Sequence, residues 1–234
     1  ALGGALFRTP DGAKQTTVLD RCLFEANTGA SAGAAYFHNS KLEVTDSTFT
    51  ANSGKGTGAI QADGTTIEFT NVTFEGNHSR EGVGATLSLF GVDGAVTNCT
   101  FSKNVCDAPN MFGAAIFGSP TLTIRNSIFD SNTGQNPGAP MQCQVGTTTG
   151  SGNLQWPKNH VNGSVVDALC VPGIFQDAEA NLGPIGDHGG PVPTLVPNLG
   201  SPALARGTSC PPFDARGVKR NAATCTSGAV EGSN

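Results

Sequence analysis

A short motif, in which an asparagine follows a phenylalanine after two residues, recurs five times along the first part of this chain. Successive phenylalanines are 25, 25, 27 and 28 residues apart, and a Gly-Ala pair follows each of the first four copies, at Gly33, Gly58, Gly84 and Gly113, with a fifth at Gly138. Two motifs that keep the same order over several copies indicate a solenoid of stacked repeats. The motif positions are Phe24, Phe49, Phe74, Phe101, Phe129 and Asn27, Asn52, Asn77, Asn104, Asn132.

Aligning the copies on phenylalanine reveals a strand before each motif. Apolar residues stand five and seven positions ahead of the phenylalanine, as Val44 and Leu42 do, and the residue between them is polar, as Glu43 is. Alternation with a period of two is typical of a strand with one buried face. Three positions ahead of the phenylalanine, residues that suit a bend predict a corner of the chain: Asp46, Asn71, Asn98 and Asn126.

One repeat of this length buries too little apolar surface to fold alone, so the copies must stack. Stacking at roughly 4.8 Å per strand places identical positions above one another. The phenylalanines then form an internal stack and the asparagines a ladder of hydrogen-bonded amides. We therefore predict an all-β parallel solenoid over residues 1–145. Residues 146–234 would supply C-terminal rungs and a capping region, and the whole chain would be one structural domain.

The repeat resembles the GGA(I/L) and FxxN repeats of bacterial and chlamydial polymorphic outer-membrane proteins. The resemblance covers about residues 3 to 145. It implies a right-handed parallel β-helix and a role as a cell-surface adhesin. A solenoid can carry many functions, so the resemblance is more specific for the fold than for activity.

The C-terminal third differs in composition from the repeats, since eleven of the fourteen prolines follow Asn136. Its motifs resemble the tail of secreted β-helix proteins of the choice-of-anchor Q type, with departures at His188, Ala205 and Thr226-Ser227. The matching segments are Leu182-Gly-Pro-Ile-Gly-Asp-His-Gly-Gly-Pro191, Gly200-Ser-Pro-Ala-Leu204, Asp214-Ala-Arg-Gly217, Arg220, Cys225 and Gly228-Ala-Val-Glu231.

We interpret this tail as a cap, because the last rung of a solenoid exposes strand edges that invite aggregation. An irregular proline-rich segment cannot add a further rung, so it would blunt that edge. We expect Asp214 and Glu231 to pair with Arg216 and Arg220 and so fix the cap. Cys210 and Cys225 flank this charged segment and are the expected disulfide.

Cysteine content indicates the compartment. Seven cysteines without a C-x-x-C pattern favour disulfides in an oxidising, extracellular or cell-surface setting over zinc or redox motifs. The odd number leaves one thiol free or paired between chains. A net charge of −5 without a basic run argues against a nucleic-acid partner, and no apolar stretch reaches the ~20 residues of a transmembrane helix.

No catalytic constellation stands out. Glu43 and Glu68 would lie on successive rungs at a separation that a retaining glycosidase uses, but two acids on a solvated strand face explain them better. The four histidines share no metal-ligand spacing. We therefore predict no catalytic residues, no metal and no cofactor.

Two functions follow as hypotheses. The first is a non-catalytic secreted or cell-surface protein, adhesive or structural, whose partners are cell-surface or carbohydrate ligands, or further copies that pair end to end into filaments or a surface layer. The alternative is a carbohydrate-active enzyme, a polysaccharide lyase or glycoside hydrolase. A row of exposed aromatic residues would favour carbohydrate contact, but most phenylalanines are expected inside.

Overall fold

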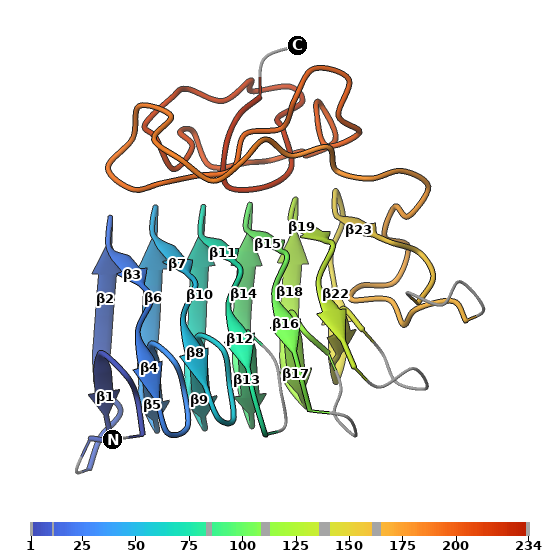
Figure 1. The fold of residues 1–234 in the computed structure, drawn as a ribbon. Helices are drawn as coiled ribbons and strands as arrows, with labels where there is room; N and C mark the ends of the chain where they lie inside the picture. Colours follow the sequence, from blue (N-terminus) through green and yellow to red (C-terminus); the bar gives the residue numbers. More distant parts are fainter. Residues whose placement is uncertain are drawn as a thin grey trace.

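The chain folds as an all-β parallel solenoid with five complete rungs and a sixth of three strands (Figure 1). The computed structural model describes residues 2–10, 12–82, 86–108, 113–135, 141–160 and 165–232, and these ranges contain no α-helix. The predicted fold class is therefore confirmed. The expected Gly84-Ala85 and Gly138-Ala139 pairs lie outside the described residues.

Each rung contributes one strand to each of four parallel sheets. Sheet 1 holds β1 (Leu6–Arg8), β5 (Ala35–His38), β9 (Ile60–Asp63), β13 (Leu87–Phe90), β17 (Ile116–Gly118) and β21 (Cys143–Gln144). Sheet 2 holds β2 (Thr16–Asp20), β6 (Lys41–Thr45), β10 (Thr66–Thr70), β14 (Asp93–Thr97), β18 (Thr121–Arg125) and β22 (Thr147–Thr149). Sheet 3 holds β3 (Leu23–Glu25), β7 (Thr48–Thr50), β11 (Thr73–Glu75), β15 (Thr100–Ser102), β19 (Ile128–Asp130) and β23 (Leu154–Trp156). Sheet 4 holds β4 (Thr28–Gly29), β8 (Ser53–Gly54), β12 (His78–Ser79), β16 (Val105–Cys106) and β20 (Thr133–Gly134).

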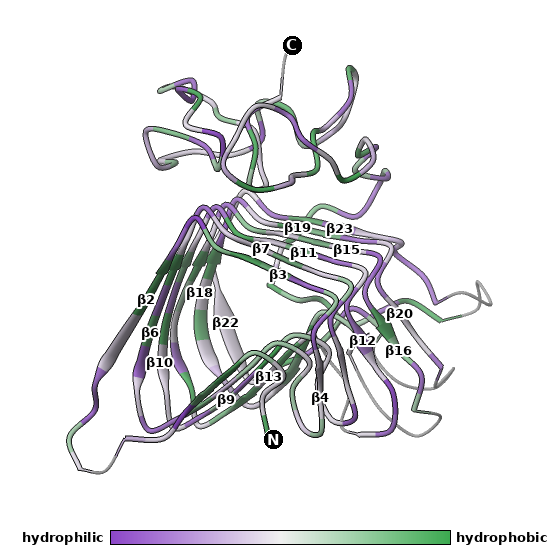
Figure 2. Ribbon diagram, turned by 60° about the vertical axis from the view of Figure 1, so that its left-hand side comes forward, coloured by the Kyte–Doolittle hydropathy of each residue, from purple (hydrophilic) through white to green (hydrophobic). Residues whose placement is uncertain are grey.

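Sheets 1, 2 and 3 form the sides of a triangle around the core, and sheet 4 projects from one corner (Figure 2). The predicted alternation is confirmed, since Leu42 and Val44 are fully buried while Glu43 between them is half-buried. The motif phenylalanines stack in one column, with ring centroids 4.6–5.2 Å apart and planes within 2–18° of parallel. Identical positions in successive repeats thus build the core.

The motif asparagines form the expected ladder, in which each side-chain amide bonds the next rung. Asn52 Nδ2 donates to Asn77 Oδ1 at 2.9 Å and to the Phe24 carbonyl at 2.9 Å, and the Asn52 backbone N–H donates to Asn77 Oδ1 at 3.1 Å. The residue before each motif asparagine has a left-handed φ between 52° and 59°. The bend three residues ahead of phenylalanine is left-handed as well, as at Asn71 with φ 56°. Two tight corners therefore flank each strand of sheet 3.

The ladder predicts that replacing two asparagines at the same motif position by alanine lowers the free energy of unfolding by very different amounts. Asn77→Ala deprives the buried Asn52 backbone N–H and the Phe49 carbonyl of their partners, which should cost about 2–4 kcal/mol of unfolding free energy. Asn27 lies at the end of the ladder, so Asn27→Ala should cost about 1 kcal/mol or less. Urea unfolding of the two variants measures the difference, and equal losses would contradict the ladder.

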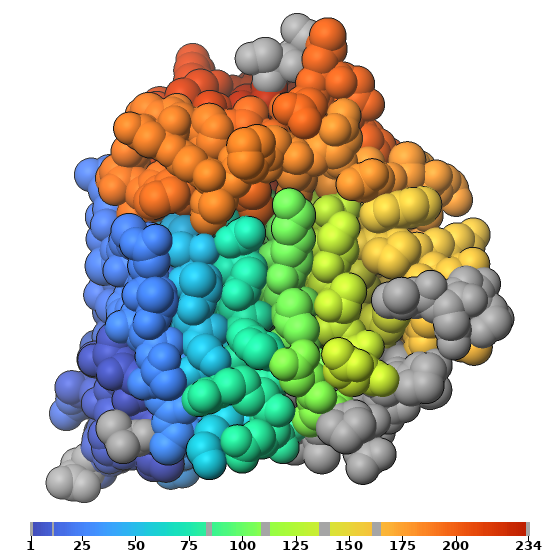
Figure 3. Space-filling view, in the orientation of Figure 1, coloured from blue at the N-terminus to red at the C-terminus, as the bar shows by residue number. Residues whose placement is uncertain are grey.

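Residues 177–232, here called the lateral cover, lie along the outside of sheet 3 (Figures 1 and 3). Hydrogen bonds tie the cover to several rungs: on the second rung Thr48 Oγ1 donates to the Pro193 carbonyl at 2.7 Å, and on the fourth rung Thr100 Oγ1 accepts the Ala229 backbone N–H at 3.0 Å. The Ala180 backbone N–H donates to Asp130 at 3.1 Å. The prediction that this segment caps the last rung is therefore wrong in its placement.

The outer face of sheet 3 explains why the tail lies there. The position before each motif phenylalanine points outward, yet Thr48, Thr73, Thr100 and Ile128 are at most 1% exposed. These side chains are uncharged and β-branched, so removing their apolar surface from water favours the placement of the cover on this face.

The shorter segment between β23 and the lateral cover lies over the last rung, in place of the predicted cap. Phe175 forms a parallel bridge with Leu154, and the Cys143–Cys170 disulfide ties the segment to β21. The Asp167 carboxylate accepts the backbone N–H of Met141 at 2.7 Å and of Gln142 at 3.0 Å. The buried Asp167 carboxylate thus accepts hydrogen bonds from two backbone N–H groups at the edge of the last rung. In a longer solenoid, a further rung would bond these groups.

Candidate functional site

The charged residues predicted for the cap come together inside the lateral cover. Asp214 is fully buried and accepts hydrogen bonds from the Arg216 guanidinium at 2.8 and 3.0 Å and from the backbone N–H groups of Arg216, Val218 and Glu231. Arg220 bonds Glu231 at 3.2 Å. The expected pairing is observed, and its position marks it as a structural network.

Arg220 also fastens the cover to the solenoid. Its Nη2 donates to Asn71 Oδ1 on the third rung at 2.9 Å and to the Gly228 carbonyl at 2.9 Å. Burial lowers the pKa of the Arg220 guanidinium, while Glu231 and Asp214 oppose that effect. A buried guanidinium with these partners holds two distant segments together.

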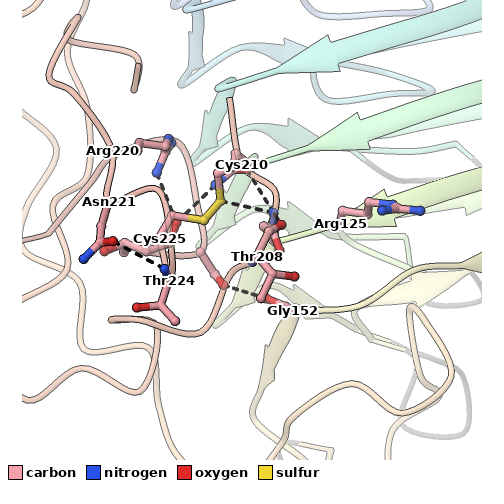
Figure 4. Close-up of a disulfide and its surroundings, with 12 residues drawn as sticks. Arg125, Gly152, Thr208, Cys210, Arg220, Asn221, Thr224 and Cys225 are labelled. Atoms are coloured by element: carbon pink, nitrogen blue, oxygen red, sulfur yellow. Dashed lines mark hydrogen bonds between the residues drawn. A yellow bond between two sulfur atoms is a disulfide. The ribbon is translucent and has the colours of Figure 1, made fainter. Parts of the chain in front are cut away.

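The Cys210–Cys225 disulfide is present, as predicted (Figure 4). It lies beside the bend at Asn126, whose Nδ2 donates to the Thr208 carbonyl at 2.9 Å. Three thiols stay free in the described residues, Cys22, Cys99 and Cys106, where the odd cysteine count required only one. Burial raises the pKa of Cys99 to about 12, so this thiol is unreactive at neutral pH.

Glu43 and Glu68 are register partners on β6 and β10, as the repeat predicted. Lys41 Nζ lies 2.7 Å from Glu43, and both side chains are more than one third exposed. The pair is thus a solvated strand face with its own counter-ion. Within the ranges that the structure describes, no group of three or more His, Cys, Asp or Glu residues could hold a metal ion.

The outer face of sheet 1 carries a feature that the sequence did not predict, a row of partly exposed side chains with one member on each complete rung. We call it the outer aromatic track. Its five members, from the first rung to the fifth, are Phe7, Tyr36, Asp63, Phe90 and Phe117.

Neighbouring members of the track are joined by ring contacts or a hydrogen bond, except Asp63 and Phe90, which are register partners. Phe7 stacks on its register partner Tyr36 with ring centroids 5.5 Å apart. The Tyr36 hydroxyl donates to Asp63 Oδ2 at 2.6 Å, and Asp63 is the register partner of Phe90. Phe90 meets Phe117 edge to face at 5.9 Å. At roughly 4.8 Å per rung, the track runs about 19 Å along the solenoid.

A hydrogen-bond chain fixes the middle of the track. Gln61 Nε2 donates to Asp63 Oδ2 at 3.3 Å, and Ser31 Oγ donates to Gln61 Oε1 at 2.5 Å. Each ring or carboxylate on the first three rungs is therefore held before any ligand arrives. Such rigidity lowers the entropy cost of binding.

Tyr36 provides a spectroscopic test of this geometry, because it is the only tyrosine in the chain. Burial, together with the hydrogen bond and the charge of Asp63, raises its pKa to about 12. Ultraviolet titration of phenolate absorbance should therefore give a midpoint near 12, and Asp63→Ala should lower it because the hydrogen bond and the charge of Asp63 both disappear. Circular dichroism at each pH checks that the fold persists, and a wild-type midpoint near the ordinary value of about 10 would contradict the contact.

The track escaped prediction because its residues lie in sheet 1, outside the columns aligned on F-x-x-N. Alternation in Ala35-Tyr36-Phe37-His38 does carry a signal, since Ala35 and Phe37 are buried while Tyr36 and His38 are not. Aligning the strands that follow the Gly-Ala pairs would have placed Tyr36, Gln61 and Phe117 in one outward column.

Comparison of the chain with protein-family models, with curated proteins and with solved structures finds no match. The residues that the structure describes include no helix long and apolar enough to cross a membrane. Function must therefore be argued from the geometry of this chain.

Proposed function

We propose that this chain is a non-catalytic, extracellular contact protein, adhesive or structural, that uses the outer aromatic track as its contact surface. The observation that carries the proposal is the set of four partly exposed aromatic side chains on the first, second, fourth and fifth rungs, with Asp63 between them on the third. Phe7, Tyr36 and Phe117 share one column of sheet 1, and Phe90 lies in the neighbouring column. Clustered exposed aromatic side chains mark interaction sites.

The surroundings of the track favour binding over catalysis. Asp63 is its only acid, and both Tyr36 and Gln61 already occupy Asp63 Oδ2. A glycosidase needs a second carboxyl group across the scissile bond. The resemblance of the repeat to surface adhesins is an independent reason for the same proposal.

The extracellular setting in this proposal is inferred from the disulfides. The Cys143–Cys170 and Cys210–Cys225 disulfides support this setting, because disulfides form and persist in oxidising compartments. Carbohydrate on a cell or matrix surface is the ligand class that suits aromatic rings mixed with amides and a carboxylate, because sugars present both C–H faces and hydroxyl groups.

A binding panel tests the proposal. We expect the protein to be retained on at least one immobilised surface polysaccharide and retention to be lost in the Tyr36→Ala variant. Phe213→Ala is the matched control, because Phe213 is a 53% exposed aromatic on the lateral cover. Retention that survives Tyr36→Ala, or that falls equally in Phe213→Ala, would sink the proposed contact surface.

A further inference from the structure

We infer that a hollow at the last rung, separate from the outer aromatic track, binds one ring of a neutral hexopyranose sugar. The hollow has a volume of about 570 Å³, which is within the roughly 300–1,000 Å³ of small-molecule sites. Its described lining comes from two segments, Trp156 to His160 and Gln176 with Asp177. We call it the end hollow, because β23, which ends at Trp156, lies at the end of the solenoid away from the N-terminus (Figure 1).

Both segments that line the end hollow are held in place by the protein itself. In the first segment, His160 Nε2 lies 3.3 Å from Asp167 Oδ1, and the Asp167 side chain is fully buried. In the second, the Phe175 carbonyl accepts the Gln155 backbone N–H at 2.8 Å, and the Arg206 guanidinium carbon lies 3.7 Å from the centre of the Phe175 ring. A site that is ordered in advance loses less entropy when a ligand binds.

Trp156 and Pro157 give the end hollow an apolar surface. Trp156 packs against the cluster below the lateral cover, yet its side chain remains partly exposed where it lines the hollow. An aromatic ring system offers a large apolar contact area with an electron-rich face. The C–H groups of a pyranose ring pack well on such a surface, so the hollow favours a sugar ring as the ligand.

The amide of Gln176 supplies a hydrogen-bonding group that the protein does not use. Gln176 is half-buried, and its Nε2 is buried without a hydrogen-bond partner. Buried polar atoms are normally bonded, so this donor indicates a place for an acceptor from a ligand. The last torsion of a glutamine side chain is broad, so the amide can turn Nε2 toward a hydroxyl oxygen in the hollow.

The charges that line the end hollow favour a neutral ligand. Lys158 Nζ lies 4.0 Å from Asp177 Oδ1, and the two side chains are 51% and 75% exposed. Because these opposite charges offset each other, the hollow does not attract an ion of either sign strongly. Sugar hydroxyl groups both donate and accept hydrogen bonds, so they can bond the Asp177 carboxylate and the Lys158 ammonium group alike.

Fluorescence titration tests the inference, since Trp156 is the only tryptophan in the chain and lines the hollow. The probes are the methyl glycosides of glucose, galactose and mannose. We expect at least one of them to change the Trp156 emission, with a dissociation constant of about 1–10 mM for a single ring. Calorimetry with the same glycoside should give the same constant.

Replacement of Gln176 separates a ligand-binding amide from a structural one. Gln176→Met keeps an unbranched side chain of similar length and removes the donor, so the affinity should fall about threefold to tenfold. Urea unfolding should be unchanged, because Nε2 has no partner to lose. Gln135→Met is the matched control, since Gln135 is exposed and does not line the hollow, and it should change neither measurement.

The contrary outcomes are distinct from those of the proposed function. Neither an emission change nor a calorimetric signal with any of the three glycosides, tighter binding of the charged methyl glucuronide, or unchanged affinity in Gln176→Met would overturn the inference. A loss of stability in Gln176→Met would do the same, because it would mark the amide as structural. Tyr36→Ala should leave the glycoside affinity unchanged, so the end hollow and the outer aromatic track stand or fall separately.

Discussion

Asp214→Ala should lower the free energy of unfolding by about 3–5 kcal/mol, because it removes one partner of a buried ion pair and leaves the other uncompensated. Asp214 is fully buried, and the Arg216 side chain that it bonds is only 13% exposed. Three backbone N–H groups also lose their acceptor. Urea unfolding measures the loss.

The same variant should loosen the lateral cover before the solenoid unfolds. Trp156 is the only tryptophan, and it packs in the cluster that joins the last rung to the cover. Its fluorescence should therefore shift to the red at a lower urea concentration in Asp214→Ala. Glu81→Ala is the control, because the exposed Lys55–Glu81 pair at 3.4 Å should be worth less than about 1 kcal/mol. Equal effects of the two substitutions would contradict a clamping role for Asp214.

Phe74→Ala should cost about 3–5 kcal/mol through lost burial and the cavity left behind. Phe74 lies mid-stack, is fully buried, and has ring neighbours at 5.2 Å in Phe49 and 4.8 Å in Phe101. Denaturant unfolding measures this loss as well.

Phe24→Ala is the matched control, because the motif position is the same and only the rung differs. Phe24 is half-buried and stacks on Phe49 alone, at 4.6 Å. Its truncation should cost no more than about 2 kcal/mol. If the two substitutions were equally costly, the core would not be the continuous stack that we describe.

The repeat made the solenoid predictable because its period is visible in residue types. Stacking forces Phe74 above Phe49 and Asn77 above Asn52, so each column carries one chemical requirement, and five copies reveal it. The Cys210–Cys225 disulfide and the Asp214–Arg216 pair were predictable for a different reason, since each joins residues close in sequence.

The placement of the lateral cover was not predictable in the same way. Its contacts join residues far apart in sequence, such as Thr48 with Pro193 and Asn71 with Arg220, and they are made once and have no period. The only signal was the outward column of Thr48, Thr73 and Thr100, which a solvated sheet could also carry. The outer aromatic track was missed because its diagonal path joins two different columns of sheet 1.

The most direct test of the central claim is to incubate the protein with each polysaccharide that retains it and to measure both bound protein and new chain ends. The account predicts retention that depends on Tyr36, with no new reducing ends and no unsaturated uronates. Cleavage of the polysaccharide that disappears in Glu43→Gln would contradict it, because the half-exposed Glu43–Glu68 pair would then be catalytic and the solenoid an enzyme.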